Sequence, residues 1–310
     1  MFVKGFLEDL IHFLHSVTEH LSITLLAGGH DQNSFLASAE FIPATKISNS
    51  LPSLPKSILG SHSMFLHNET IMICGGQNNL KTCLKLQEGS WTEYNSLKEG
   101  RSHGALVSTT TATFIFGGYY SEDTYEYLEK NAASEWKLGE TKIPGGFHQG
   151  CSVAISQDEI WLLGGYDNEQ RVLSFNVNNQ KFTVLPTELK QGRYEHRCAF
   201  IPGTRNIIVT GGFIFEPTVS TEIIDVETRN VTEGPSMNSK RANHGIGVLD
   251  IERQERLVVF GGQASAQASD TSYHKSVEFY NAQMQKWQLT NIELSEAKGS
   301  FGFMTIKSQP

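Results

Sequence analysis

The chain has 310 residues and a formal net charge of −8, from 25 lysines and arginines against 33 aspartates and glutamates. An acidic chain without a basic stripe does not fit the nucleic-acid-binding class, and no apolar run reaches the length of a membrane span. Glycine accounts for 28 residues and charged residues for only 19 %, a composition typical of a turn-rich β protein.

Residues 1–20 are expected to form one amphipathic helix ahead of the main domain. Their apolar side chains recur at helical spacing: Val3, Phe6, Leu7, Leu10, Ile11, Phe13, Leu14 and Val17. Glu8 and Asp9 interrupt the apolar stretch that a signal peptide would need. The sequence therefore slightly favours a cytoplasmic protein, with secretion as the alternative. The helix could pack against the main domain or serve as a handle for another module.

A Gly-Gly pair ends an apolar run six times along the rest of the chain. The pairs begin at Gly28, Gly75, Gly117, Gly164, Gly211 and Gly261, so neighbouring pairs lie 42 to 50 residues apart. Self-similarity with this period predicts a propeller or a solenoid. A glycine pair suits a strand that ends near a crowded axis, because glycine has no Cβ to clash where backbones approach closely.

Each repeat is predicted to form four strands, which together make one propeller blade. The first strand begins near a histidine, the second is the apolar run before Gly-Gly, and the third follows a polar loop. The fourth strand opens with a bulky residue: Trp91, Trp136, Phe182, Val231 or Trp287. The first repeat starts at its second strand near Leu21, and residues 295–307 resemble the missing first strand. We expect this segment to complete the N-terminal blade and close the ring.

Six Gly-Gly pairs, each preceded by an apolar strand and followed by an aromatic residue on the outer strand, resemble the kelch repeat. The resemblance covers residues 21–307, with departures at Ile47 and Val231, where the late aromatic is missing. It implies an all-β fold, a single six-bladed kelch-type β-propeller over residues 21–310. It also implies a non-enzymatic scaffold that binds a protein or peptide, because the family includes substrate receptors of ubiquitin ligases, actin-binding proteins and secreted adhesion-like proteins.

Three arginines point to one face of the ring as the binding surface. Arg101, Arg193 and Arg241 lie in or just after the loops that join neighbouring blades, on the same face as the loops that follow Gly-Gly. The latter loops contribute the aromatic residues Tyr119, Tyr166 and Phe213. Arginine and aromatic residues are typical of binding hot spots. Three guanidinium groups around one concavity predict an acidic ligand, since arginine pairs with carboxylates in a bidentate fork.

A histidine lies near the start of the inner strand in five repeats: His62, His103, His148, His196 and His244. Converging imidazoles could bind a metal, but no carboxylate or thiolate recurs with them, so we predict neither a metal nor a cofactor. Packing and hydrogen bonding are the main expected role, with ligand contact by His103, His148, His196 and His244 as the second. No G-x-S-x-G, Walker or H-E-x-x-H motif is present. The alternative function is a metal-dependent or small-molecule enzyme that uses the axial cavity, galactose-oxidase-like or specifier-protein-like.

The four cysteines form two candidate pairs. Cys74 and Cys83 lie at opposed positions of a predicted hairpin and are the favoured disulfide pair. Cys151 and Cys198 occupy equivalent positions in neighbouring blades. The inner strands of adjacent blades are expected to diverge, so buried free thiols are favoured for this second pair.

Two N-x-S/T glycosylation acceptors, Asn68 and Asn230, are present. Both are expected in turns on the face opposite the proposed binding loops.

Overall fold

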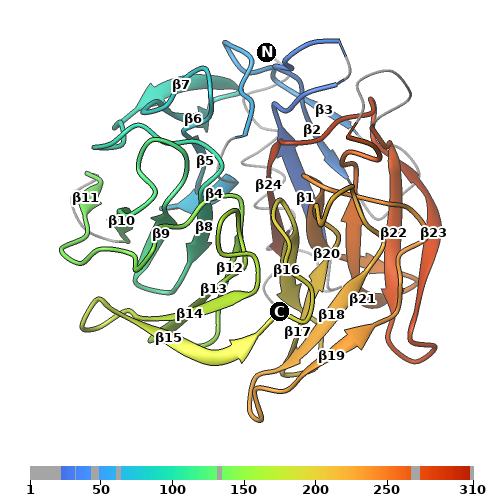
Figure 1. Ribbon diagram of the computed structural model, residues 1–310. Coiled ribbons are helices and arrows are strands. Elements are labelled where there is room, and N and C mark those ends of the chain that lie inside the picture. Colours follow the sequence, from blue (N-terminus) through green and yellow to red (C-terminus); the bar gives the residue numbers. More distant parts are fainter. Residues whose placement is uncertain are drawn as a thin grey trace.

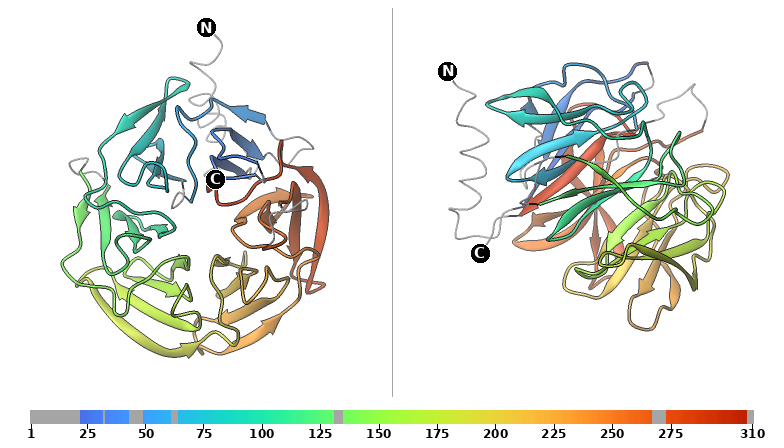
Figure 2. Two further views of the ribbon diagram at one scale, coloured as in Figure 1. Left: turned by 45° about the horizontal axis from the view of Figure 1, so that its top comes forward. Right: turned by 90° about the vertical axis from the view of Figure 1, so that its left-hand side faces the viewer.

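A computed structural model describes residues 22–31, 33–42, 49–60, 64–130, 135–266 and 273–307 of the chain. The secondary structure of these residues is all β, and it forms six four-stranded sheets arranged around one axis (Figures 1 and 2). The predicted six-bladed propeller is therefore confirmed. The helix expected for residues 1–20, its boundary with the propeller, and Ile47 lie outside the described residues.

Each blade runs from an inner strand at the axis to an outer strand at the rim. Blade 1 contains β24 (Gly302–Lys307), β1 (Ser22–Ala27), β2 (Ala39–Ile42) and β3 (Asn49–Leu51). Blade 2 contains β4 (Met64–His67), β5 (Thr70–Cys74), β6 (Cys83–Gln87) and β7 (Ser90–Tyr94). Blade 3 contains β8 (Ala105–Ser108), β9 (Ala112–Phe116), β10 (Tyr125–Glu129) and β11 (Lys137–Leu138).

The second half of the ring repeats this order. Blade 4 contains β12 (Cys151–Ala154), β13 (Glu159–Leu163), β14 (Arg171–Asn176) and β15 (Lys181–Glu188). Blade 5 contains β16 (Arg197–Phe200), β17 (Asn206–Thr210), β18 (Thr221–Asp225) and β19 (Val231–Gly234). Blade 6 contains β20 (Gly245–Ile251), β21 (Gln254–Phe260), β22 (Ser276–Asn281) and β23 (Lys286–Glu293).

The C-terminal strand closes the ring, as the sequence predicted. β24 pairs antiparallel with β1 over six residue pairs, from Ser22 opposite Lys307 to Ala27 opposite Gly302. The two ends of the described chain therefore share one sheet, where the dark red and dark blue strands lie side by side in Figure 1. Blade 1 gains its inner strand in this way, and the edge of β1 that would otherwise be unpaired is covered.

A closed ring of backbone hydrogen bonds surrounds the axis. It is formed by one residue at the entrance to each inner strand, and we call these residues the axial ring: Gly60, His103, Gln149, Glu195, Asn243 and Ser300. Each N–H donates to the carbonyl of the preceding member, at N···O distances of 2.5–2.9 Å, and Gly60 donates to Ser300 to complete the circle. All six have φ between 52° and 61°, a left-handed conformation that costs a non-glycine residue about 1–2 kcal/mol. Neighbouring blades are thus joined through the main chain.

The Gly-Gly pairs provide a second set of main-chain links between blades. In all six repeats the N–H of the second glycine donates to a carbonyl in the loop that enters the next blade, as from Gly118 to Phe147 at 2.8 Å. A Cβ added to Gly117, whose φ is +59°, would lie 1.7 Å from the carbonyl oxygen of Phe147. A side chain there would collide with the backbone, so the blade-to-blade contact explains why the sequence repeats glycine at this point.

Large side chains near the outer strands fill the widening space between blades. Trp136 and Trp287 are buried, and Trp91 of β7 donates its indole N–H to the carbonyl of Pro52 at 2.7 Å. Phe182 is half-buried and packs against Phe175, with ring centroids 4.8 Å apart. The packing role predicted for these residues is consistent with these contacts.

All four cysteines are in disulfides. Cys74 and Cys83 lie directly opposite each other on β5 and β6. Cys151 of β12 and Cys198 of β16 join the inner strands of blades 4 and 5, with a Cα–Cα distance of 6.0 Å. The expectation of free thiols at this second pair is wrong, because these strands have not yet diverged where they leave the axial ring.

Peptide mapping under non-reducing conditions should recover two linked pairs, Cys74 with Cys83 and Cys151 with Cys198, from protein made in an oxidising compartment. The geometry brings each pair together without rearrangement. Four alkylatable thiols in such a preparation would contradict both bridges.

Deletion of residues 299–310 should lower the melting temperature by about 10 °C or more, which thermal unfolding followed by circular dichroism would measure. The deletion removes β24 and the axial-ring residue Ser300, so it opens both the sheet of blade 1 and the ring of backbone hydrogen bonds. A melting temperature equal to that of the intact chain would show that closure contributes nothing to stability.

Candidate functional site

The three arginines predicted to face a ligand are buried inside the blades. Arg101, Arg193 and Arg241 are each 0 % exposed. The Nη1 atom of each donates to the carbonyl of the first glycine of a Gly-Gly pair, at 2.6–2.9 Å. The expectation that they line the binding face is wrong, because the ends of the second and third strands enclose the guanidinium groups.

A buried glutamate near the start of the third strand neutralises each of these arginines. The N···O distances are 3.0 Å for Arg101 and Glu126, 2.7 Å for Arg193 and Glu222, and 2.9 Å for Arg241 and Glu278. Blade 1 has the same arrangement with lysine, since Lys298 lies 2.6 Å from Glu40. The glutamates also accept backbone N–H groups from the loop that precedes the cation, at Lys98, Lys190, Asn238 and Ser295. The pair therefore fixes the entrance of the chain into the blade.

The other two blades replace this ion pair with an apolar pair. In blade 2 the arginine position is Ile58 and the glutamate position is Leu84, and both belong to one buried apolar cluster. In blade 4 the corresponding residues are Phe147 and Leu173, again in one cluster. Cation and glutamate are therefore both present or both absent within a blade. This pattern can be seen in the sequence and is the signal that sequence analysis missed.

The candidate histidines do not form one ring. His103 is a member of the axial ring, His148 precedes its blade's member, and His196 and His244 follow theirs. His196 and His244 are fully buried, and His244 Nε2 lies 2.8 Å from the hydroxyl of Thr210. Burial lowers the pKa of His103 to about 4 and those of His196 and His244 well below the usual value. His62 lies outside the described residues.

The described residues contain no group of three or more histidine, cysteine or acidic side chains that could hold a metal ion. His196 and His244 stay neutral at neutral pH and inside their blades, so a packing role fits them better than ligand contact.

Six aromatic rings form a continuous chain along the loops of blades 3 to 5, and we call it the aromatic arc: His103, Tyr119, His148, Tyr166, Tyr194 and Phe213. Successive ring centroids lie 4.7–5.5 Å apart, within the range of favourable aromatic contact. Five of these residues were candidates from the sequence, and Tyr194 was not. The structure thus brings Tyr119, Tyr166 and Phe213 together around the mouth of the ring.

Exposed aromatic side chains extend the arc outward. The loop face, formed by the loops after Gly-Gly and the loops between blades, carries Tyr120 at 74 % exposure and Phe215 at 93 %. Phe35 and Tyr166 are about half exposed on the same face, at 46 % and 45 %. Exposed aromatic residues concentrated on one face of a rigid ring are typical of an interaction surface.

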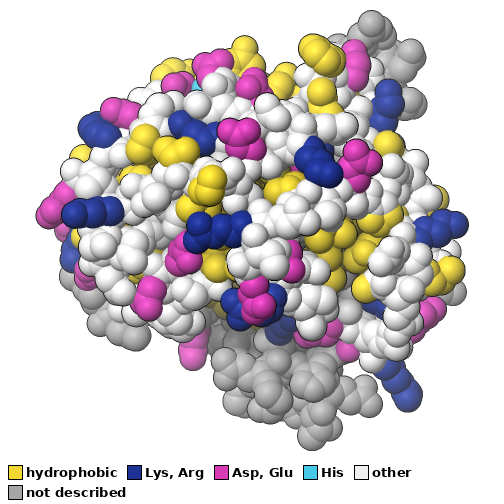
Figure 3. All heavy atoms as spheres, turned by 60° about the horizontal axis from the view of Figure 1, so that its bottom comes forward, with side chains coloured by type: hydrophobic (Ala, Val, Ile, Leu, Met, Phe, Trp, Pro, Cys, Tyr) yellow, Lys and Arg dark blue, Asp and Glu magenta, His cyan; other side chains and the backbone are white. Residues whose placement is uncertain are grey.

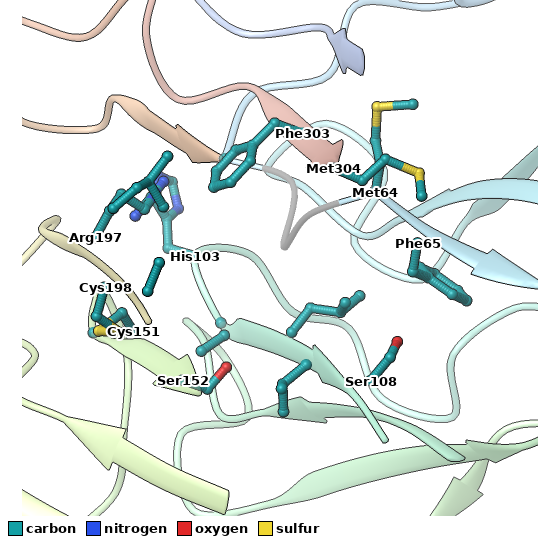
Figure 4. A pocket seen from close by; sticks show the side chains of 18 of the residues that line it. Met64, Phe65, His103, Ser108, Cys151, Ser152, Arg197, Cys198, Phe303 and Met304 are labelled. Carbon is teal, nitrogen blue, oxygen red and sulfur yellow. A yellow bond between two sulfur atoms is a disulfide. The ribbon is translucent and has the colours of Figure 1, made fainter. Parts of the chain in front are cut away.

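An axial cavity of about 420 Å³ lies among the inner strands, below the axial ring. Figure 4 shows Arg197 and His103 on one side, Phe303 close to them, and Met64 and Met304 further along the wall. At the ring end, Gln149 and Asn243 donate side-chain hydrogen bonds to the two carboxylate oxygens of Glu195. Burial raises the pKa of Glu195 to about 7.

Comparison with known proteins gives one informative relative. The chain is 24 % identical over 220 residues to a RING finger domain and kelch repeat-containing protein of Dictyostelium discoideum. The alignment covers 68 % of this chain. The chain is a six-bladed β-propeller that is similar to a kelch repeat-containing protein. The match spans only 21 % of the relative, and no family model matches the chain.

The propeller presents its two glycosylation acceptors away from the aromatic arc. Asn68 lies in the turn between β4 and β5, and Asn230 lies just before β19. Both are exposed, and both turns are on the face opposite the loop face. Within the described residues, no helix is long and apolar enough to cross a membrane.

Replacing Arg193 with alanine should lower the free energy of unfolding of the propeller by about 3–5 kcal/mol, because Glu222 would remain buried without its partner. Urea unfolding would measure the change. Arg205→Ala is the matched control, since Arg205 pairs with Glu227 at 67 % and 68 % exposure and its loss should cost less than about 1 kcal/mol.

The apolar pairs of blades 2 and 4 provide a further comparison. The double change Arg193→Ile with Glu222→Leu copies the Ile58 and Leu84 pair and should be less destabilising than Arg193→Ala alone. An Arg193→Ala protein as stable as the Arg205→Ala control would contradict the structural role of the buried pair.

Proposed function

We propose that this kelch propeller is a non-enzymatic scaffold that binds a protein or peptide partner on its loop face. The observation that supports the proposal is the aromatic arc, with Tyr120 and Phe215 exposed beside it. Aromatic side chains offer large contact areas at low cost in conformational entropy. The loops that carry them are held by the two sets of blade-to-blade hydrogen bonds, so the surface is formed before a partner arrives.

The chemistry of the loop face favours a partner with aromatic, apolar or basic side chains over an acidic one. The acidic ligand was inferred from Arg101, Arg193 and Arg241, whose charges are neutralised inside the blades. Carboxylates stand beside the arc instead: Glu122 lies 3.1 Å from His148 Nδ1, and Glu169 helps to raise the pKa of Tyr194. Cationic side chains can also bind over aromatic faces.

Charge alone does not identify a binding surface elsewhere. On the face in Figure 3, lysines and arginines are interspersed with aspartates and glutamates, so the described residues there form no extensive patch of one sign. The proposal therefore rests on the aromatic side chains of the loop face and not on electrostatic steering.

We propose an oxidising compartment for the protein, in line with the secreted alternative. Disulfides persist mainly outside the cytosol, and the structure contains two. Glycans on Asn68 and Asn230 would leave the loop face clear.

Replacing Tyr120, Tyr166 and Phe215 together with serine should reduce the amount of captured partner protein at least about tenfold, because these side chains supply exposed contact area. The matched control carries serine at Val184, Met284 and Leu289, which are 57–62 % exposed outside the loop face. Quantitative affinity capture followed by mass spectrometry would compare the two variants with the unaltered protein. Both variants should keep the melting temperature.

Partners that the control variant loses and the loop variant keeps would place the binding site on the blade rims. That result would overturn the proposed loop-face site.

A further inference from the structure

We propose a second, separate site in the axial cavity, where the propeller binds a small molecule that carries a carboxylate on a short apolar body. The site differs from the loop face, because its walls are the inner strands and His103 is the one member of the aromatic arc that lines it. The volume of about 420 Å³ is within the range of small-molecule pockets.

Arg197 is the group that would hold the carboxylate. It lies on β16, lines the cavity, and donates one hydrogen bond, from Nη1 to the carbonyl of His196 at 3.0 Å. Its guanidinium carbon lies 5.7 Å from the centre of the Phe303 ring. Among the described residues no carboxylate forms an ion pair with it, unlike Arg101, Arg193 and Arg241. Arg197 therefore keeps donors that can form a bidentate fork with an incoming carboxylate.

The charge on Arg197 persists in the cavity. Burial lowers its pKa to about 10, and nearby Glu195 raises it, so the guanidinium is ionised at neutral pH. His103 is neutral there, because burial and the nearby Arg197 lower its pKa to about 4. A cation in a cavity is costly when its neighbouring carboxylate, Glu195, is mostly protonated, as it is below pH 7, and an anionic ligand would remove that cost.

Glu195 makes the affinity of the site depend on pH. Its carboxylate accepts hydrogen bonds from Gln149 and Asn243 and interacts electrostatically with Arg197. It also contributes to the raised pKa values of Tyr119, Tyr194 and Tyr273. With its pKa raised to about 7 by burial, Glu195 is mostly protonated at pH 6 and mostly ionised at pH 8. Ionised Glu195 competes with the ligand for Arg197, so binding should weaken as pH rises. Gln149 Oε1 is buried without a hydrogen-bond partner and could accept a donor from the ligand.

Apolar side chains supply the rest of the pocket. The wall beyond Arg197 is formed by Met64, Leu106, Ile246, Phe303 and Met304 from four different blades. Lys130 and Ser108 lie at the far end, where Lys130 Nζ donates to the carbonyl of Thr109. The cavity thus has Arg197 at the ring end, Lys130 bound to a backbone carbonyl at the far end, and apolar side chains between them, which suits a carboxylate on a short apolar body.

Isothermal titration calorimetry with 3-phenylpropionate tests the site on the full chain, with 3-phenylpropionamide as the uncharged analogue. We expect saturable binding of the acid at pH 6, about tenfold weaker binding at pH 8, and at least about tenfold weaker binding of the amide. Arg197→Met, which keeps the length of the side chain, should lose at least about tenfold. Arg205→Met, an equal charge change on the surface, should bind like the unaltered protein.

Glu195→Gln should keep binding and lose the pH dependence, which distinguishes this site from a general effect of charge. The triple serine variant of Tyr120, Tyr166 and Phe215 should bind 3-phenylpropionate like the unaltered protein. The cavity is thus tested separately from the loop-face proposal. Equal affinity for acid and amide, full binding by Arg197→Met, or a pH profile unchanged by Glu195→Gln would each overturn the proposal. Absence of saturable binding of 3-phenylpropionate, hexanoate and indole-3-acetate would overturn it as well. If Arg197→Met does not fold, the amide and Glu195→Gln comparisons decide.

Discussion

The axial ring of backbone hydrogen bonds is the constraint on which the rest of the propeller depends. Its six members bond the entrances of the inner strands to one another, and each adopts a left-handed conformation to do so. The ring is closed only because Ser300 arrives with the C-terminal strand and bonds to Gly60 and Asn243. Closure by the C-terminal strand and closure of the axial ring are therefore the same event, and the ring residues also line one end of the axial cavity.

A second layer of interactions fixes each blade to this centre. Four blades use a buried cation with glutamate, and two use an apolar pair at the same positions. Because these cations are neutralised inside the blades, they do not contribute charge to the loop face. Arg197 is different: it has no such glutamate partner and faces the cavity. The cations that pair with glutamate inside the blades therefore stabilise the fold, whereas Arg197, which lines the cavity, is the candidate for ligand binding.

Much of the fold could be predicted from the sequence, because the six Gly-Gly pairs mark a contact that only glycine allows, and residues 295–307 repeat the pattern of an inner strand. The site was harder to predict. Arg193 and Glu222 are 29 residues apart in the sequence. The short motif around Arg193 therefore gave no sign that its side chain turns into the blade and pairs with that glutamate. The histidines looked equivalent, but His148 lies one residue before its axial-ring member, Gln149, and His196 lies one residue after its own, Glu195. Tyr119, Tyr166 and Phe213 could be predicted from the sequence because each is the residue immediately after a Gly-Gly pair.

Amide hydrogen exchange tests the central role of the axial ring most directly. The N–H groups of His103, Gln149, Glu195, Asn243 and Ser300 lie in connecting segments, yet each donates to the neighbouring member of the ring. They should exchange as slowly as amides of the buried strand β1, through global unfolding. Exchange as fast as that of the exposed loop residues Tyr120 and Phe215 would contradict the account.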